Sequence, residues 1–245
     1  MSNSAKCAFL IIGDEILCGK TKDSNLQTLA LKLGEMGYEI GEVRVVPDEE
    51  KEIIKAVNEL REKYFLVFTS GGIGPTHDDI TTEAIAKALG AELETNAKAF
   101  KDLEEFYNNK NVEFNEARNK MAIVPKGCVL IANSISTAPG FKLQNVCVLA
   151  GIPSIFSTML DAFLPSLPEG KKIYSLEISS NVITEGMIAP ELTNIAKKYL
   201  GVVAIGSYPS THQDGSHNLK ITFRSSNLIK CEECKNECLE LFEKR

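Results

Sequence analysis

A glycine-rich loop that ends in two adjacent carboxylates is the segment of this sequence best suited to chemistry. It reads Ser70-Gly71-Gly72-Ile73-Gly74-Pro75-Thr76-His77-Asp78-Asp79 and follows an apolar run. Its three glycines let the backbone turn sharply and approach a ligand closely. A helix that begins after the loop points unpaired N–H groups back at that ligand, and Thr76 adds a hydroxyl donor. The pattern predicts an anion-binding loop; the alternative is an ordinary strand-to-helix turn.

Further carboxylates follow two other apolar runs. Asp14 and Glu15 come directly after the first run, and Asp48 comes after the second. Because the carboxyl ends of parallel strands share one edge of a sheet, we expect these side chains to gather beside the glycine loop. Oxygen ligands next to a phosphate suit Mg²⁺, Mn²⁺ or Co²⁺. The predicted metal ligands are Asp14, Glu15, Asp48, Asp78 and Asp79. The alternative is a solvated acidic rim whose carboxylates cap helices.

The elements that must position these residues alternate between strands and helices. Apolar runs at residues 7–12, 38–46 and 64–69 predict buried parallel strands. Helical stripes lie at residues 26–36, with Ser24 as the predicted cap, at 48–60 and at 80–89. This order predicts an α/β fold, a three-layer, mostly parallel sheet with helices on both faces.

The remainder of the sequence predicts helices that cover one edge of the sheet, followed by a second unit. Polar helices are expected at residues 96–121, strands at 129–132 and 141–150, and a helix from Gly151 to Ala162. Pro165, Pro168 and Gly170 form a Pro/Gly-dense break. We therefore expect one domain at residues 1–168 and a small α+β module at 169–245.

Composition narrows the classes of function. The 245 residues carry a net charge of −6, which argues against a nucleic-acid partner. No run is long enough for a membrane helix and no signal peptide opens the chain, so a reduced, cytoplasmic protein is expected. Cys231, Cys234 and Cys238 share a helical face, and they predict a buried core stripe in preference to a zinc site, which would need a fourth ligand.

Five motifs in register resemble one known family. They are Gly13-Asp14-Glu15-Ile16-Leu17, Val46-Pro47-Asp48, the loop with Ile80-Thr81-Thr82-Glu83-Ala84, Thr137-Ala138-Pro139-Gly140, and Gly151-Ile152-Pro153. Over residues 6–165 the pattern is similar to the MoaB/Mog-type molybdopterin-binding domain. It is most similar to the amino-terminal domain of CinA proteins and of eukaryotic FAD synthases. The amidohydrolase domain of full-length CinA has no counterpart in these residues, so its activity is not expected.

The resemblance implies a cleft for a small phosphorylated ligand, either a nucleotide diphosphate or molybdopterin. The implied ligand-binding residues are Gly13, Ser70, Gly71, Gly72, Gly74, Pro75, Thr76, Pro139, Gly140, Gly151 and Pro153. Asp48 and Asp79 match the catalytic aspartates of the Mog enzymes. The segment Pro75-Thr76-His77-Asp78 is more similar to the CinA pattern than to the Mog pattern. This similarity implies metal-dependent hydrolysis of ADP-ribose or FAD. Molybdopterin adenylyl transfer, or non-catalytic ligand binding or assembly, are the alternatives. A homo-oligomer, dimer or trimer, is also implied.

Overall fold

The computed structural model describes residues 6–211 and 217–243 of the chain. The chain divides into two units, Met1–Gly170 and Lys171–Arg245. The division follows the Pro/Gly-dense segment that ends at Gly170. This segment is held to the first unit, because Leu167 packs against its core and the Gly170 N–H donates to the Met36 oxygen at 2.9 Å.

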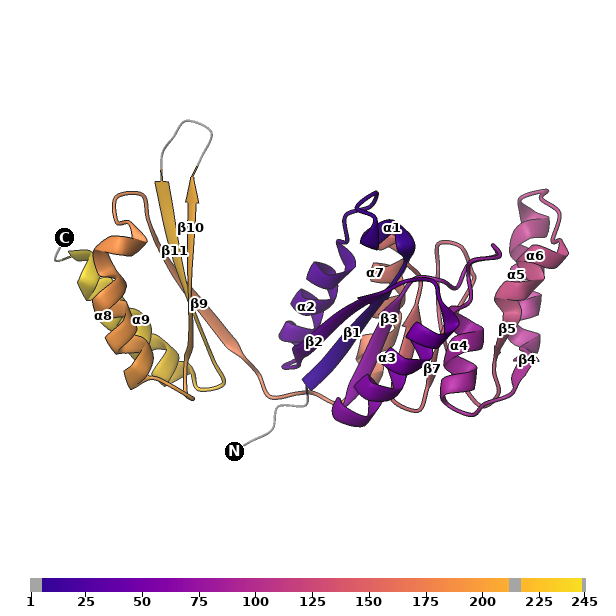
Figure 1. The fold of residues 1–245 in the computed structure, drawn as a ribbon, viewed down its shortest axis with the longest axis horizontal. Coiled ribbons are helices and arrows are strands. Elements are labelled where there is room, and N and C mark those ends of the chain that lie inside the picture. Colours follow the sequence, from indigo (N-terminus) through magenta and orange to yellow (C-terminus); the bar gives the residue numbers. More distant parts are fainter. Residues whose placement is uncertain (1–5, 212–216, 244–245) are drawn as a thin grey trace. The chain divides into compact units, whose positions relative to one another are not determined.

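A six-stranded sheet forms the centre of the first unit (Figure 1). Its order is β2 (Glu39–Val46), β1 (Lys6–Ile12), β3 (Leu66–Ser70), β8 (Val146–Leu149), β7 (Gly140–Leu143) and β6 (Val129–Ile131). The first four strands are parallel, and β7 runs antiparallel to both of its neighbours. The predicted α/β class with a mostly parallel sheet is thus confirmed.

Helices cover both faces of this sheet, because alternate residues of each strand point to opposite sides. In β1, Phe9 and Ile11 join a core with α2 (Asn25–Glu35) and α7 (Pro153–Phe163). Leu10 and its alternate neighbours join a second core with α3 (Glu50–Lys63) and α4 (Thr81–Ala88). Burial on both faces explains why residues 7–12 form a continuous apolar run.

One predicted strand was wrong. Residues 141–150 form a hairpin, in which β7 and β8 pair antiparallel with Leu143 opposite Val146. Gln144 adopts a φ of 51°, which reverses the chain in a two-residue turn. The two polar residues at this turn, Gln144 and Asn145, interrupt the apolar run and were the sequence signal for the reversal.

A helical arm leaves the sheet between α4 and β6. It contains β4 (Leu93–Thr95), α5 (Ala97–Asn109), α6 (Glu116–Asn119), the 3-10 turn η1 (Lys120–Ala122) and β5 (Ile123–Pro125). Ala99, Leu103 and Ala122 form its own small core. The antiparallel pair β4–β5 brings the end of the arm back to its start, so η1 returns toward the main sheet.

The strand order creates a switch point between β1 and β3. From β1 the chain passes through α2 to β2, on one side of the sheet's centre. From β3 it passes through α4 and the arm toward β8, on the other side. Because α2 and α4 lie on opposite faces, the loops after β1 and β3 part and leave a crevice at their carboxyl ends. The glycine loop follows β3 at this point.

The second unit has a three-stranded antiparallel sheet in the order β10 (Ala204–Thr211), β11 (His217–Ser225) and β9 (Tyr174–Ser180). Helices α8 (Glu185–Lys198) and α9 (Leu228–Glu243) contribute to its core. Cys231, Cys234 and Cys238 are fully buried there, so the predicted core stripe is confirmed. Burial raises the pKa of the Cys238 thiol to about 12, which keeps it neutral. None of the helices in the described residues combines the length and apolar character needed to span a bilayer.

The Glu42 carboxylate on β2 should make the stability of the folded protein depend on pH. It accepts hydrogen bonds from Lys63 Nζ at 2.7 Å, Arg44 Nε at 2.7 Å and Tyr64 Oη at 2.9 Å. These bonds lower its pKa from 4.5 to about 2, with Lys63 the largest cause. The stabilisation is therefore complete above pH 4.5 and is lost as the pH falls toward 2. Thermal unfolding should show Glu42→Gln less stable than wild type at pH 7 and equal to it at pH 2. An equal difference at both pH values would contradict this.

Candidate active site at the strand ends

The glycine loop begins with a residue that has no room for a side chain. Gly71 has a φ of 108°, and a Cβ at this position would lie 2.1 Å from the backbone oxygen of Ile12. A Cβ on Gly151 would lie 3.2 Å from the Gly71 Cα. The ends of β1 and β3 and the loop after β8 therefore meet at Gly71 with backbone against backbone. Glycine is required here by this close approach as well as by the turn.

Much of the hydrogen-bonding capacity of the loop is used inside the protein. Five backbone N–H groups donate to protein acceptors, namely Gly71 to Leu149, Thr76 to the Asp79 side chain, Asp79 to Thr76, Ile80 to Asp78, and Thr81 to Gly72. Within the described residues, the N–H groups of Gly72, Ile73, Gly74 and His77 have no such acceptor. The loop donors available to an anion are thus fewer than the sequence predicted, and three of these four lie at residues 72–74.

Asp79 acts as a clamp on the loop. Its Oδ2 accepts a hydrogen bond from Thr76 N–H at 2.8 Å and another from the Thr76 hydroxyl. A Cβ on Gly74 would lie 2.6 Å from the same oxygen, so Gly74 makes room for the carboxylate. The spacing of glycine, threonine and aspartate therefore has a structural reason. The Thr76 hydroxyl, predicted as a ligand donor, is engaged with Asp79 in this structure.

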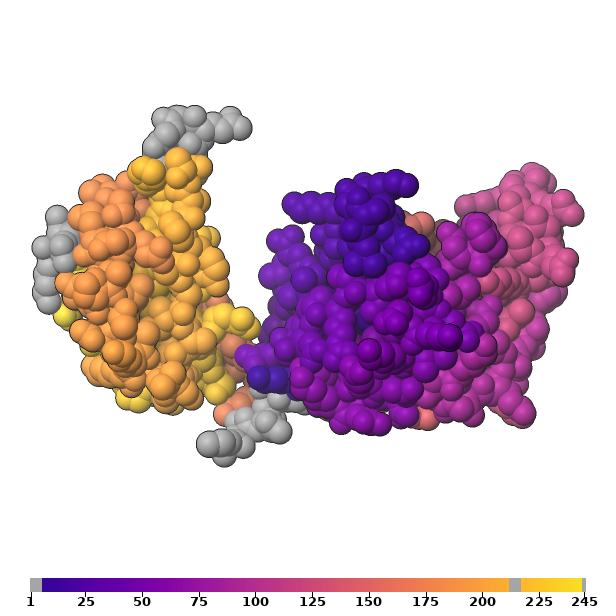
Figure 2. All heavy atoms as spheres, in the orientation of Figure 1, coloured from indigo at the N-terminus to yellow at the C-terminus, as the bar shows by residue number. Residues whose placement is uncertain are grey.

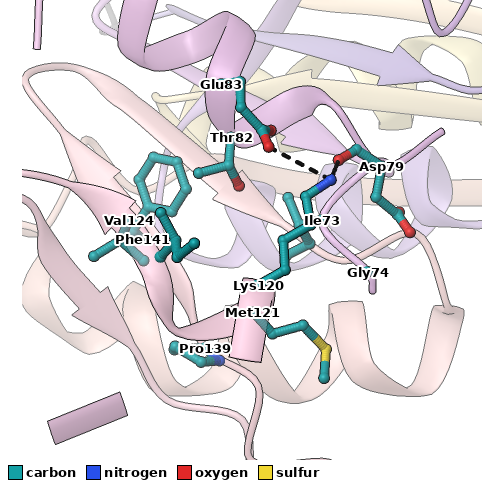
Figure 3. A pocket seen from close by; sticks show the side chains of 11 residues that line it. Ile73, Gly74, Asp79, Thr82, Glu83, Lys120, Met121, Val124, Pro139 and Phe141 are labelled. Carbon is teal, nitrogen blue, oxygen red and sulfur yellow. Dashed lines mark hydrogen bonds and ion pairs between the residues drawn. The ribbon is translucent and has the colours of Figure 1, made fainter. Parts of the chain in front are cut away.

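Lys120 holds the loop from the helical arm. Its Nζ donates to the backbone oxygen of Asp79 at 2.5 Å and lies 3.4 Å from that of Thr76. It also pairs with Glu83 Oε1 at 3.4 Å, and Figure 3 shows the Asp79 carboxylate pointing away from this cluster. No sequence signal indicated Lys120, because residues 79 and 120 meet only when the arm folds back. The arm and the glycine loop thus form one structural unit.

Replacing Lys120 with methionine should loosen the loop. The variant keeps most of the side-chain volume but removes the donor to two backbone carbonyls and the partner of Glu83. We expect amide hydrogen exchange at residues 72–79 to become about 5- to 10-fold faster, because about 1 kcal/mol of local hydrogen bonding is lost. Lys126→Met, on an exposed lysine just past the arm, is the control. Unchanged exchange in Lys120→Met would show that Lys120 does not anchor the loop.

A carboxylate cluster lies on the β2 side of the loop. Asp48 Oδ2 accepts a hydrogen bond from the Asp14 backbone N–H at 3.0 Å. Burial raises the pKa of Asp48; this hydrogen bond opposes the rise, and the negative charges of Asp14, Glu15 and Asp78 add to it. The Thr76 hydroxyl and the Asp78 backbone N–H lower the pKa of Asp78, helped by His77 and Lys120. The pKa values of Asp48 and Asp78 are therefore shifted in opposite directions, and the ionised form is disfavoured at Asp48.

These carboxylates approach one another without forming a complete metal cage. Asp14, Glu15 and Asp78 are close enough to Asp48 to act on its pKa, whereas Asp79 is turned into the loop. Among the described residues, no three His, Cys, Asp or Glu side chains form a metal-holding group. Mg²⁺ is commonly held by one or two protein carboxylates together with substrate phosphates. The predicted divalent cation therefore stays a prediction, in which one or two of these carboxylates would hold it together with a phosphorylated ligand.

Two pockets flank the glycine loop. One, which we call the arm-side pocket, has walls of Ile73, Gly74, Asp79, Thr82, Glu83, Lys120, Met121, Ile123, Val124, Pro139 and Phe141 (Figure 3). The other, the α2-side pocket, includes Ser70, Gly151 and Pro153 together with Glu15 and residues 21–25. In the space-filling view, the α1 segment (Asp14–Leu17, indigo) and the α5–α6 arm (pink) both project at this end of the unit (Figure 2).

The other predicted ligand residues take different positions. Pro75 and Thr76 are exposed at the tip of the loop, and Gly13 lies against the Glu15 carboxylate. Gly140 is buried in β7, where a Cβ would lie 2.4 Å from the Val148 oxygen, so its role in this structure is packing. Asn115 on the arm accepts the Arg118 N–H at 3.1 Å and caps α6.

Fold and site together define an α/β domain whose carboxyl-terminal rim suits a small phosphorylated ligand. The chain belongs to the family of probable molybdopterin binding domains, whose model matches residues 8–169. This family includes enzymes. Residues 172–245 match the middle domain of FAD synthase.

Relatives are similar to this chain over most of its length. A protein of Sulfurisphaera tokodaii is 37% identical over 212 residues, covering 83% of this chain and 78% of the relative. A protein of Saccharolobus islandicus is 33% identical over 247 residues, covering 95% and 93%. The crystal structure of CinA, of unknown function, from Thermoplasma acidophilum has 32% identity and a TM-score of 0.62, covering 67% of this chain and 99% of that one. The resemblance seen in the sequence is thus confirmed.

Proposed function

We propose that this protein is a metal-dependent hydrolase that cleaves the P–O–P linkage of a nucleotide diphosphate such as ADP-ribose or FAD. The observation that carries the proposal is Asp48, a half-buried carboxylate with a raised pKa beside Asp14, Glu15 and Asp78. Like charges close together are unfavourable, and a divalent cation or a transferred proton relieves that repulsion. The cluster lies at the end of the sheet where ligands of such folds bind.

Each residue of the site has its own role in the proposed hydrolysis. Asp48 orients the attacking water and accepts its proton as the water oxygen bonds to phosphorus. The bond from phosphorus to the bridging oxygen then breaks, and two monophosphates leave. The unpaired N–H groups of Gly72, Ile73 and Gly74 bind phosphate oxygens, while Asp79 and Lys120 keep the loop in place. A bound Mg²⁺, Mn²⁺ or Co²⁺, held by Asp48 with Asp14, Glu15 or Asp78, would neutralise the developing charge.

The test is an assay of the whole chain with ADP-ribose and with FAD, each in Mg²⁺, Mn²⁺ and Co²⁺. Chromatography should detect AMP together with ribose 5-phosphate or FMN. Chelation of the metal should abolish product formation. Asp102→Asn is a matched control, because Asp102 lies on α5 and pairs with Lys98 away from the cluster. No turnover with any of the three metals, or full turnover in both Asp48→Asn and Asp79→Asn, would refute the proposal.

Molybdopterin binding with adenylyl transfer is the second candidate, favoured by the family match over residues 8–169. It predicts that the chain binds purified molybdopterin and transfers AMP to it from ATP. Failure to bind the pterin, combined with hydrolysis of a diphosphate, would decide for the first candidate. A homo-oligomer, dimer or trimer, is proposed for either function, and light scattering would measure it.

A further inference from the structure

Thr137, in the loop between β6 and β7, has a backbone conformation that its own side chain disfavours. Its φ is 67°, in the left-handed region, where the two branches at Cβ crowd the backbone. The other non-glycine residues with positive φ in the described part of the chain, Asn111 and Gln144, are unbranched at Cβ. Thr137 is therefore the strained one of the three, at a position in a turn that glycine normally occupies.

Asn133 holds this strained conformation in place. Its backbone oxygen accepts the Thr137 N–H at 3.0 Å, which closes a single helical turn. Asn133 is only 6% exposed, and its Oδ1 accepts the N–H groups of Ile135 and Ser136. Its Nδ2 donates to Ser136 Oγ at 2.6 Å and to the Ala138 oxygen at 2.9 Å. A strained backbone persists only when its surroundings fix it, and this loop is fixed by every hydrogen bond that an Asn side chain can make.

The β6–β7 loop approaches the glycine loop from the arm side. Ala138 packs against the core of the arm, and Pro139 shares the wall of the arm-side pocket with Gly74 and Lys120 (Figure 3). The charged side chains of this pocket are already engaged within the protein, Lys120 with Glu83 among them. An uncharged polar part of a ligand therefore fits this side of the site better than a phosphate does.

The Thr137 hydroxyl is available to such a ligand. It has no hydrogen-bond partner among residues 6–211 and 217–243. The residue is half-buried, and its oxygen is not among the unpaired side-chain atoms that are closed off from solvent. A hydroxyl can donate to one group and accept from another, so it can recognise either an O–H or a carbonyl or ring nitrogen.

We propose that Thr137 is a specificity-determining residue, whose hydroxyl hydrogen-bonds to the nucleoside that is attached to the diphosphate. Glycine would relieve the strain at this position but would supply no hydroxyl. The Asp48 cluster lies toward β2 and the Thr137 loop follows β6, which are the opposite edges of the sheet. The inference rests on the proposed function, because it names the part of the substrate that the arm side recognises.

Calorimetric titration of the whole chain with ADP-ribose and with inorganic pyrophosphate, without added metal, tests this role. Thr137→Val keeps the branched shape and removes the hydroxyl, so it should bind ADP-ribose about 3- to 10-fold more weakly than wild type. Pyrophosphate has no nucleoside, so both proteins should bind it equally. Thr137→Ser should restore ADP-ribose binding. Ser134→Ala, which removes an exposed hydroxyl in the same loop, is the matched control and should change nothing.

Thr137→Gly separates the strain from the hydroxyl. Glycine adopts a φ of 67° freely, so this variant should melt about 2–4 °C above Thr137→Val. It should nevertheless bind ADP-ribose as weakly as Thr137→Val does. Wild-type affinity for ADP-ribose in Thr137→Val or Thr137→Gly, or an equal weakening of pyrophosphate binding, would overturn the proposal.

The role of Thr137 and the proposed reaction fail in different ways. ADP-ribose binding that depends on the Thr137 hydroxyl, without hydrolysis of any diphosphate, would refute the reaction and retain the role of Thr137. Hydrolysis of ADP-ribose with equal binding by wild type and Thr137→Val would refute the role of Thr137 and retain the reaction.

Discussion

Asp48→Asn is expected to lower the rate of diphosphate hydrolysis at least about 100-fold while making the folded protein slightly more stable at neutral pH. The amide removes the proton acceptor and a metal ligand. Its Oδ1 still accepts the Asp14 N–H, so the 3.0 Å contact is kept. The repulsion between Asp48 and the charges of Asp14, Glu15 and Asp78 disappears. Loss of activity with a gain in stability is the signature of a functional carboxylate.

The pH dependence of that gain follows from the sign of the pKa shift. Burial and the neighbouring carboxylates raise the pKa of Asp48 above 3.8 in the folded state, so ionisation disfavours folding. Wild type should lose stability relative to Asp48→Asn as the pH rises through this raised pKa, by less than about 1 kcal/mol. Below pH 3.8 the two proteins should unfold at equal denaturant concentrations. A variant that is less stable than wild type at pH 7 would contradict the assignment and identify Asp48 as a structural residue.

Gly71→Ala is expected to destabilise the first unit by roughly 2–4 kcal/mol. The added Cβ would lie 2.1 Å from the Ile12 backbone oxygen, at a φ of 108° that alanine rarely adopts. Ile12 is only 2% exposed and paired with Val46 on β2, so the strand has little freedom to move away. Chemical denaturation followed by circular dichroism would measure the loss.

Gly34→Ala provides the matched control for Gly71→Ala. Gly34 lies near the end of α2, and a Cβ there would meet no atom within 4 Å. Alanine disfavours the unfolded chain relative to glycine and favours the helix, so this variant should be more stable by about 0.5–1 kcal/mol. Equal effects of the two substitutions would show that close approach at Gly71 does not govern stability.

Local pattern was sufficient to predict the main elements of the fold. The continuous apolar run at residues 7–12 indicated a strand buried on both faces, and Phe9 and Leu10 do face opposite cores. The stripe of Cys231, Cys234 and Cys238 indicated a buried helix face, and all three thiols are fully buried. These predictions succeed because burial imposes a period of two on strands and 3.6 on helices, which a sequence displays directly. The hairpin at Gln144 was missed because its two polar residues are a weak turn signal.

The gathering of carboxylates after successive strands was also readable from the sequence. Parallel strands place their carboxyl ends on one rim, so Asp14 and Asp48 were expected together, and they are joined by a hydrogen bond. The sequence did not show which role each carboxylate has. Asp78 and Asp79 are neighbours in sequence, yet Asp78 acts on Asp48 while Asp79 clamps Thr76. Adjacent side chains diverge according to the backbone angles of the loop, and those depend on contacts with β1 and β8.

The sequence by itself determined the fold class, the family and the sheet edge at which Asp14 and Asp48 meet, because each follows from periodicity or from short motifs. Only the tertiary structure decided the roles of Lys120 and Asn25. Lys120 reaches the glycine loop from a position 41 residues beyond Asp79. Asn25 meets Ser70 and Gly151 across 45 and 126 residues. Such contacts leave no local pattern, because they depend on how β3, β8, α2 and the helical arm pack in three dimensions.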